Sequence, residues 1–291
     1  MSDVVPMIER IGVVGCGLMG SGIAEVCARA GLDVMIREID ETAAEAGRGR
    51  LVKSLDRGLT AGKMTEAERD AAVGNLHFTT DIADMADRQL VVEAVVEDAS
   101  MKVDIFKQLD QVVTADGAIL ASNTSSIPIM KLGTATQRPE QVIGIHFFNP
   151  VPVLRLVELV TSLMTSDDTA ARSDAFATDI LHKRVIRSQD RAGFVVNALL
   201  IPYLLSAIRM MESGFASADD IDTGMVEGCS HPMGPLRLTD LIGLDTTLAV
   251  AESLYEEFKE PLYAPPPLLS RMVDAGLLGR KTGRGFYDYQ R

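Results

Sequence analysis

Cysteine and positive charge are both scarce in this sequence. Its 291 residues include only Cys16, Cys27 and Cys229, which are too few and too scattered for a disulfide framework or a zinc site. Acidic residues outnumber basic residues by 41 to 28, which leaves a net charge of −13 and argues against general binding to nucleic acid or to an anionic membrane. We therefore expect no bound metal, no nucleic-acid partner and no membrane partner.

Long apolar runs are equally rare. Residues 192–211 are mostly apolar, but they include Asn197, Pro202 and Arg209, and no second such segment exists. A buried helix of a helical domain explains this segment better than a membrane span. The first ten residues, MSDVVPMIER, contain no apolar signal core, so we expect a protein of the reducing cytoplasm.

The first part of the chain alternates short apolar runs with helical patterns, which is typical of a mostly parallel sheet covered on both faces. A capping box formed by Thr65 and Glu68 predicts the start of one helix. The expected strands cover residues 9–14, 33–39, 76–80, 89–95, 117–122, 141–147 and 183–188, and the other helices cover 18–30, 40–61, 98–113 and 167–182.

From Arg191 onward the apolar spacing is helical. Ser217 with Asp220 predicts one helix start, and the expected helix ends are at Gly214, Gly228, Gly243 and Gly276. We therefore predict an α/β fold with a Rossmann-type, mostly parallel sheet over residues 1–190 and an all-helical domain over 191–291. The apolar character of the helical half also predicts a homodimer.

A glycine fingerprint, Gly15-Cys-Gly-Leu-Met-Gly20, follows the first expected strand and opens the first expected helix. Gly15 allows a tight turn, Gly17 lets the backbone approach a pyrophosphate, and Gly20 lets helix and strand pack closely. The helix N-terminus, with Leu18 and Met19, then supplies amide donors to the phosphates.

An acidic residue follows the fingerprint at the end of the second expected strand. This residue, Glu38, can accept both ribose hydroxyls of an adenosine and would repel a 2′-phosphate, which favours NAD over NADP. Arg37 beside it could soften this preference, so NADP stays possible.

A second signal lies in the segment Gly144–Val160, where a strand ending in His146 and Asn149 leads through Pro150 and Pro152 to a strand carrying Glu158. The prolines exclude a helix and place the His and the Glu on neighbouring segments. An imidazole oriented by a carboxylate is a minimal general base. The residues alone leave open a core histidine and a surface glutamate that never meet.

Six further motifs follow the fingerprint in order: VVEAVVED (91–98), ASNTSSIPI (121–129), HFFNPVPVLRLVELV (146–160), RAGFVVNALL (191–200), HPMGPLRLTDLIGLD (231–245) and GRKTGRGFY (279–287). Together they resemble the short-chain L-3-hydroxyacyl-CoA dehydrogenases, most of all the bacterial 3-hydroxybutyryl-CoA dehydrogenase branch. The resemblance covers nearly the whole chain. It implies reversible NAD(H)-dependent oxidation of a 3-hydroxyacyl-CoA, with 3-hydroxybutyryl-CoA and acetoacetyl-CoA as substrate and product, in fatty-acid or butyrate metabolism.

The resemblance also implies roles for individual residues. His146 would be the catalytic base and Glu158 its partner, while Ser125 and Asn197 would hold the reacting oxygen of the substrate. The implied cofactor contacts beyond the fingerprint are Glu97, Lys102, Asn149 and Lys281. Ser54 matches a position that touches CoA, and the accompanying lysine is Lys53 or Lys63.

Several alternatives stay open at this point. A related dehydrogenase could act on a hydroxy acid without CoA, such as L-gulonate or carnitine, and a non-catalytic NAD-binding protein could share the fold, as some lens crystallins do. Ser125 and Ser126 could merely cap a short helix near Pro128. His231, in a proline-glycine loop, fits a structural role, and Cys16 fits a small filler beside the glycine turn.

Overall fold

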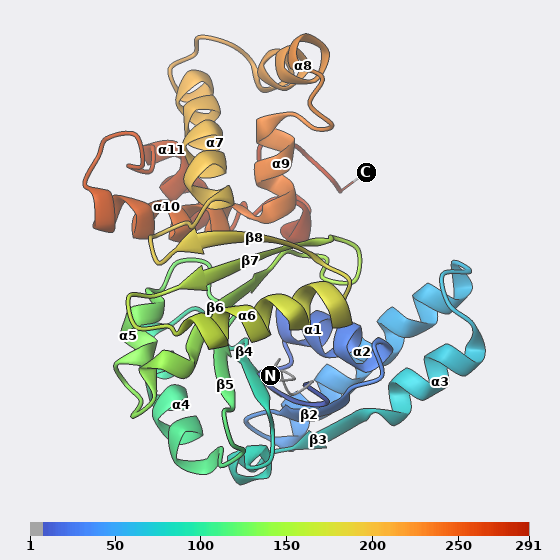
Figure 1. The fold of residues 1–291 in the computed structure, drawn as a ribbon. Helices are drawn as coiled ribbons and strands as arrows, with labels where there is room; N and C mark the ends of the chain where they lie inside the picture. Colours follow the sequence, from blue (N-terminus) through green and yellow to red (C-terminus); the bar gives the residue numbers. More distant parts are fainter. Residues whose placement is uncertain (1–7, 291) are drawn as a thin grey trace. The chain divides into compact units, whose positions relative to one another are not determined.

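The computed structural model of the protein describes residues 8–290. The chain divides into two compact units, one ending at Asp190 and the other beginning at Arg191 (Figure 1). Residues 1–7, which contribute to the expectation about export, lie outside the described residues.

An eight-stranded sheet organises the first unit, with its strands in the order β3-β2-β1-β4-β5-β6-β7-β8. Strands β1 to β6 are all parallel to one another. Strand β7 is antiparallel to β6, and β8 is parallel to β7. Buried runs of Val, Ile and Leu suit strands that are covered on both faces, and the predicted mostly parallel sheet is confirmed. The strands are β1 (Arg10–Val14), β2 (Asp33–Arg37), β3 (Leu76–Thr79), β4 (Leu90–Glu93), β5 (Ile119–Ser122), β6 (Val142–Phe147), β7 (Leu156–Thr161) and β8 (Arg184–Gln189).

Helices flank this sheet on both sides, and Figure 1 shows α4 and α5 on the side opposite α1 and α2. The predicted capping box is confirmed, because the Thr65 hydroxyl accepts from the amide of Glu68 and the Glu68 carboxylate accepts from the amide of Thr65. The elements are α1 (Leu18–Arg29), α2 (Glu41–Thr60), α3 (Glu66–Gly74), η1 (Ile82–Met85), α4 (Ala99–Val112), α5 (Ile129–Gly133), η2 (Pro139–Gln141), α6 (Asp167–Ala175) and η3 (Phe176–Ile180).

The helix expected over residues 167–182 is not uniform. Helix α6 ends at Ala175, and η3 continues as a π-helical turn in which the amide of Leu181 donates to the carbonyl of Phe176. The Thr178 hydroxyl donates to the carbonyl of Asp174 at 2.9 Å. Such a side-chain bond competes with the helical ladder, which accounts for the widened turn.

The pleat of the sheet sorts its side chains between two layers. Ile143, Ile145 and Phe147 of β6 pack with α1 and η3, so His146, between two of them, faces the other layer because neighbouring strand residues point to opposite faces. The same alternation places Glu93 of β4, Ser122 of β5 and Glu158 of β7 on the face that His146 occupies. One face of the sheet therefore carries a row of polar side chains.

The second unit is built from helices around its own apolar core, which includes Leu205, Leu236 and Leu254. Its elements are α7 (Val196–Glu212), α8 (Ala218–Cys229), α9 (Pro235–Ile242), α10 (Leu244–Phe258), α11 (Pro267–Asp274) and η4 (Arg280–Thr282). Together with the sheet of the first unit, this core confirms the predicted fold class.

The helix-end signals in the second unit were right in all but one case. Ser217 caps α8 as predicted, with its hydroxyl 3.1 Å from the amide of Asp220. The end expected at Gly228 is wrong, because α8 continues to Cys229 and Ser230 takes the left-handed position at φ 57°. Gly214, Gly243 and Gly276 all have positive φ and follow helices.

Candidate active site

His146 and Glu158 meet in the buried core of the first unit. They are opposite partners in the antiparallel pair β6–β7, and His146 Nδ1 lies 2.7 Å from Glu158 Oε2. His146 is 7% exposed and Glu158 is fully buried. The alternative in which the two side chains never meet is therefore wrong. A carboxylate at this distance accepts a hydrogen bond from Nδ1–H, which leaves Nε2 of a neutral imidazole as a proton acceptor.

The glycine fingerprint forms a turn at the carboxyl end of β1. Gly15 has φ +91°, and a Cβ there would come within 2.8 Å of the carbonyl oxygen of Ala94, while a Cβ on Gly20 would overlap the carbonyl oxygen of Gly15. A Cβ on Gly17 would meet nothing within 4 Å. The backbone is thus packed tightly at the first and third glycines and open at the second.

Gly17 is also the N-cap of α1 and has no side chain of its own with which to cap the helix. The first amides of an α-helix have no acceptor within the helix and bind anions well. Leu18 is exposed, and Met19 packs partly against the core. An uncapped helix start behind an open glycine fits a cofactor pyrophosphate.

Glu38 and Arg50 hold the fingerprint loop from two sides. The Glu38 carboxylate accepts from the amide of Cys16 at 2.5 Å, and the Arg50 guanidinium donates to the carbonyl of Cys16 at 2.7 Å. Arg37 has a buried Nε with no hydrogen-bond partner among the described residues. The sequence did not indicate this role of Arg50, because Arg50 lies 34 residues from Cys16 along the chain.

Large apolar side chains are exposed around this end of the sheet. Ile39 follows Glu38 and is 73% exposed, and Val96 and Met101 lie exposed beside Glu97 and Lys102. Exposed apolar groups next to convergent polar groups are typical of a ligand site. Such side chains can pack against the flat aromatic base of a dinucleotide.

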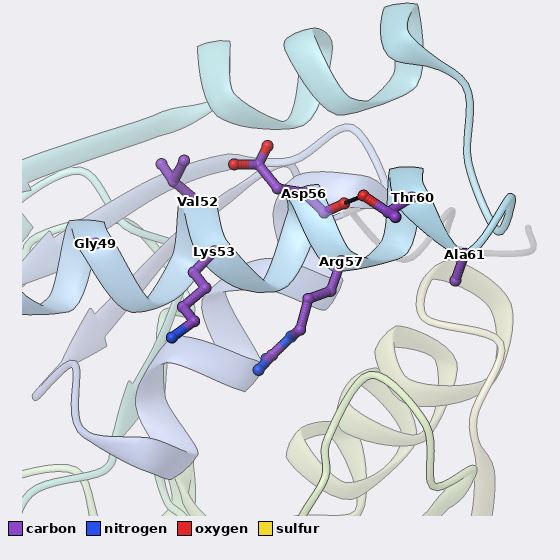
Figure 2. A pocket seen from close by; sticks show the side chains of 7 residues that line it. All are labelled: Gly49, Val52, Lys53, Asp56, Arg57, Thr60 and Ala61. Atoms are coloured by element: carbon purple, nitrogen blue, oxygen red, sulfur yellow. Dashed lines mark hydrogen bonds between the residues drawn. The ribbon is translucent and has the colours of Figure 1, made fainter.

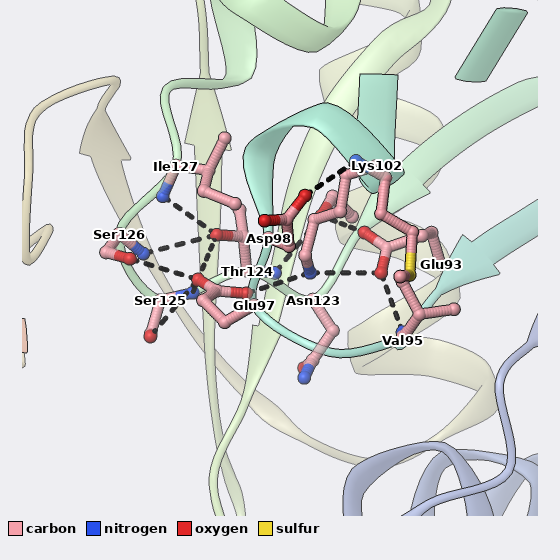
Figure 3. A network of polar contacts seen from close by, with 12 residues as sticks. Glu93, Val95, Glu97, Asp98, Lys102, Asn123, Thr124, Ser125, Ser126 and Ile127 are labelled. Atoms are coloured by element: carbon pink, nitrogen blue, oxygen red, sulfur yellow. Dashed lines mark hydrogen bonds and ion pairs between the residues drawn. The ribbon is translucent and has the colours of Figure 1, made fainter. Parts of the chain in front are cut away.

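Glu97 and Lys102 belong to a network that reaches residues 123–126, the NTSS segment (Figure 3). Lys102 Nζ lies 2.9 Å from Glu97 Oε2. Glu97 Oε1 accepts from the Thr124 hydroxyl at 2.5 Å and from the amide of Ser125 at 2.9 Å. Burial alone would raise the pKa of Glu97, but the charge of Lys102 and these hydrogen bonds hold it below its usual range.

The hydroxyls of Ser125 and Ser126 both lie within hydrogen-bond reach of Glu97 Oε1. Helix α5 is capped from a distance by Asp190, whose carboxylate accepts from the amides of Ile129 and Met130 at 2.8 and 2.7 Å. The cap on these two amides is therefore Asp190, whereas the sequence had suggested a serine near Pro128.

Three further predicted residues are Asn149 of the first unit and Asn197 and Lys281 of the second. Asn149 is exposed after β6. Asn197 and Lys281 belong to the second unit, Asn197 in the first turn of α7 and Lys281 in η4, where its Nζ forms an ion pair with Asp245 at 2.5 Å. The Asn197 side chain is partly exposed and has no hydrogen bond within residues 8–290.

Helix α2 carries the predicted CoA positions. Ser54 is half-buried and Lys63 is exposed in the turn after the helix. An open depression of about 520 Å³ runs along α2, and Figure 2 shows Lys53 and Arg57 extending to one side of the helix. Neither cation has an ion pair in the described part of the chain. Arg57 was missed, although its spacing of four residues from Lys53 places both on one helical face.

His231 and Cys16 each have contacts within their own unit. His231 Nδ1 lies 3.2 Å from the Tyr203 hydroxyl within the second unit. Cys16 is buried against Gly47, and this burial, with the nearby charge of Glu38, raises the pKa of its thiol to about 12. A thiol that stays protonated is a poor nucleophile and acts as a small filler.

Across residues 8–290 we find no helix whose length and hydropathy would let it traverse a lipid bilayer. The same stretch has no grouping of three or more His, Cys, Asp or Glu side chains suited to a metal ion.

Comparison with known proteins identifies the family. Residues 10–191 match the NAD binding domain of 3-hydroxyacyl-CoA dehydrogenase, and residues 193–289 match its C-terminal domain. The chain belongs to the 3-hydroxyacyl-CoA dehydrogenase family. This membership confirms the resemblance drawn from the motifs, and with it an enzyme built on an NAD-binding domain.

Individual members of the family are similar over their full length. The 3-hydroxybutyryl-CoA dehydrogenase of Mycobacterium tuberculosis is 63% identical over 289 residues, which cover 99% of this chain and 100% of the relative. The crystal structure of M. tuberculosis FadB2 matches with a TM-score of 0.97 at 63% identity, covering 98% of this chain and 100% of the other. That of (S)-3-hydroxybutyryl-CoA dehydrogenase PaaH1 from Ralstonia eutropha gives 0.92 at 46% identity, with coverage of 98% and 100%.

Proposed function

We propose that this family member catalyses the reversible, NAD-dependent oxidation of L-3-hydroxyacyl-CoA to 3-ketoacyl-CoA, with 3-hydroxybutyryl-CoA as its preferred alcohol. The buried contact between His146 and Glu158 supports this reaction most strongly, because alcohol oxidation needs a base for the hydroxyl proton. Full-length similarity to 3-hydroxybutyryl-CoA dehydrogenases supports the choice of a four-carbon acyl group. We assign the reaction to cytoplasmic fatty-acid or butyrate metabolism.

His146 moves the proton in this proposal. Its Nε2 takes the proton of the substrate 3-hydroxyl, and Glu158 holds the ring in one tautomer and stabilises the imidazolium that forms. In the reverse direction the imidazolium returns the proton to the alkoxide oxygen. Because both side chains stand on strands and are buried, the base is pre-oriented before substrate binds.

The proposed cofactor is NAD, which supplies the hydride acceptor when it is bound. Gly15, Gly17 and the first amides of α1 would hold its pyrophosphate, and Glu38 its adenosine ribose. Glu97, Asn149 and Lys281 keep the cofactor roles that the family resemblance implies, whereas Lys102, buried between Glu93 and Glu97, reaches the cofactor only through Glu97. The carboxylate of Glu38 favours NAD over NADP.

The substrate is held by two sets of residues in this proposal. Ser125 and Asn197 orient the reacting oxygen so that the C3 hydrogen is presented for transfer. Lys53 and Arg57, beside Ser54 on α2, bind the phosphates of CoA. In a chain with net charge −13, two unpaired cations on one helical face give an anionic ligand a local positive site. Lys63, exposed in the following turn, is the competing lysine.

A homodimer formed through the second unit is also part of the proposal. Val195, the N-cap of α7, and Leu199 and Met210 within the helix are exposed at spacings that place them along one side of it, and exposed apolar groups favour association. Light scattering coupled to size exclusion would test it. A mass of 31.4 kDa, that of one chain, would contradict a dimer.

Steady-state kinetics with matched substrates test the function. Acetoacetyl-CoA and longer 3-ketoacyl-CoAs are compared with free acetoacetate, and L-gulonate and carnitine are assayed in the oxidative direction. We expect the highest kcat/KM with acetoacetyl-CoA and NADH. Preference for a free hydroxy acid would indicate a related dehydrogenase that does not use CoA. Binding of NADH without turnover of any of these compounds would indicate a non-catalytic protein.

A further inference from the structure

Glu93 is a fully buried carboxylate at the end of β4 that the proposed reaction does not use. Its Oε2 accepts from the Ser122 hydroxyl of β5 at 2.6 Å, and its Oε1 accepts from the amide of Val95 at 2.7 Å. Lys102 Nζ lies 3.0 Å from the same Oε1. One carboxylate therefore joins two strands, the loop after β4 and helix α4.

Lys102 carries this contact outward to Glu97. Its side chain is 1% exposed, and its ammonium lies between Glu93 and Glu97 at 3.0 and 2.9 Å. A buried ammonium engaged by two carboxylates has little freedom to turn toward a ligand. It instead fixes the position of Glu97, whose side chain is 35% exposed at the edge of the site.

Glu97 in turn gathers the NTSS segment (Figure 3). Its Oε1 lies within hydrogen-bond reach of the amide and hydroxyl of Ser125 and of the hydroxyls of Thr124 and Ser126. One carboxylate oxygen has too few lone pairs to accept from all four of these donors. The Ser125 hydroxyl is the farthest of the four, at 3.4 Å, and is the donor held least. The amide of Ser125 therefore stays bound to Glu97 while its hydroxyl can turn to a ligand.

We propose that Glu93 is a positioning residue that, through Lys102 and Glu97, sets the place of Ser125. The proposal rests on the proposed function for the importance of Ser125, but the chain of contacts stands on geometry alone. Lys102 then acts on substrate and cofactor through Glu97.

A purely structural role for Glu93 makes different predictions. Buried ion pairs contribute little net stability compared with well-packed apolar groups, although breaking one is costly. Small displacements of an orienting group can lower turnover about 100-fold without preventing binding. A positioning role of Glu93 should therefore lower kcat in a variant that still folds, whereas a purely structural role should leave kcat of the folded variant unchanged.

Glu93→Gln tests the proposal, with Glu25→Gln as its control. Glu25 is a buried carboxylate on α1 whose partner is Arg29 at 3.6 Å, away from this network. With acetoacetyl-CoA and NADH we expect Glu93→Gln to lower kcat about 10- to 100-fold, with smaller changes in KM and in the dissociation constant for NADH measured by fluorescence. Glu25→Gln is expected to keep the wild-type kinetic constants. Ser122→Ala weakens the same anchor without unpairing a charge, and should lower kcat less.

A double-mutant cycle of Glu93 and Glu97 tests whether Glu93 acts on turnover through Glu97 or independently of it. If Glu93 acts by that route, Glu93→Gln should add little to the kcat loss caused by Glu97→Gln, because interacting residues are not additive. Losses that multiply, or a folded Glu93→Gln enzyme with wild-type kcat, would overturn the proposal. If the wild type does not turn over acetoacetyl-CoA, the proposed function fails, whereas the contact chain is still tested by exchange.

Hydrogen exchange supplies that independent readout. The amide of Ser125 is protected by Glu97, so exchange in residues 123–127 of the ligand-free protein should be faster in Glu93→Gln than in the wild type or Glu25→Gln. Unchanged exchange in this segment would overturn the proposal whatever the activity.

Discussion

His146 and Glu158 face each other across β6 and β7, with Nδ1 2.7 Å from Oε2. Their meeting is a property of the strand register, because a slip of one residue would turn either side chain to the opposite face of the sheet. Both residues are buried in the same row that contains Glu93 and Ser122. His146 and Glu158 are therefore held in place by the sheet of the first unit.

Replacement of Glu158 by Gln should reduce turnover severely. The glutamine amide can donate to Nδ1 and so stabilise the tautomer whose proton lies on Nε2, where the base is needed. We expect kcat to fall about 10²- to 10⁴-fold in a steady-state assay with acetoacetyl-CoA. Glu158→Asp keeps the charge with a shorter reach and should lie between the wild type and Glu158→Gln. Equal activity of all three folded proteins would exclude a role for the carboxylate.

Charge removal at Glu38 should shift cofactor preference. Glu38→Gln keeps an oxygen that can accept from the amide of Cys16 but ends repulsion of a 2′-phosphate. We expect the ratio of kcat/KM for NADPH to that for NADH to rise about 10- to 100-fold. Glu41→Gln removes the same charge from an exposed site three residues along the chain and serves as the control. A similar shift in both variants would show a general effect of net charge.

The two cations of α2 should act on binding and leave the chemistry intact. Lys53→Ala combined with Arg57→Ala should raise the KM for acetoacetyl-CoA about 10- to 30-fold with kcat unchanged, if each charge contributes about 1 kcal/mol. Acetoacetyl-pantetheine lacks the nucleotide and should show no such change. An effect confined to Lys63→Ala would assign the phosphate contact to the turn instead.

Lys102→Met should destabilise the protein in a pH-dependent way. Breaking a buried ion pair costs about 3–5 kcal/mol at neutral pH. In the wild type Lys102 helps to hold the pKa of Glu97 below its ordinary 4.5, so this contribution is present above pH 4.5 and is lost as the pH falls through the folded-state pKa. In Lys102→Met the carboxylates of Glu93 and Glu97 repel each other without a cation between them. Protonation of Glu97 at low pH removes this repulsion.

The stability difference between wild type and Lys102→Met should therefore narrow below about pH 4.5. Urea unfolding from about pH 3 to about pH 7 measures this difference across the window below pH 4.5, with Lys107→Met, on the exposed face of α4, as the control. Parallel pH profiles for wild type and Lys102→Met would contradict the assigned coupling.

Local patterns in the sequence were enough to predict much of this protein. The glycine fingerprint, the capping box of Thr65 and the apolar runs of the sheet each depend on neighbouring residues, and the structure has all three. The proline turn indicated that His146 and Glu158 lie on adjacent segments. It did not give their register, which depends on how β7 pairs with β6.

Contacts between distant residues were the part that could not be predicted. Asp190 caps α5 from 61 residues away, and Arg50 reaches the fingerprint loop across 34 residues. Glu93 and Lys102 did leave a signal, an acid within an apolar strand and a lysine among the buried positions of α4. The family resemblance implied a cofactor role for Lys102 and no role for Glu93, because the burial of the lysine cannot be read from its spacing alone.

The most direct test of the proposed reaction is turnover of acetoacetyl-CoA with NADH by His146→Gln, measured beside the NADH dissociation constant. His231→Gln, which changes the histidine bonded to Tyr203, is the matched control. We predict that kcat of His146→Gln falls by at least about 100-fold while NADH binding is unchanged, and that His231→Gln keeps wild-type turnover. A folded His146→Gln protein that binds NADH and turns over acetoacetyl-CoA at the wild-type rate would contradict the account.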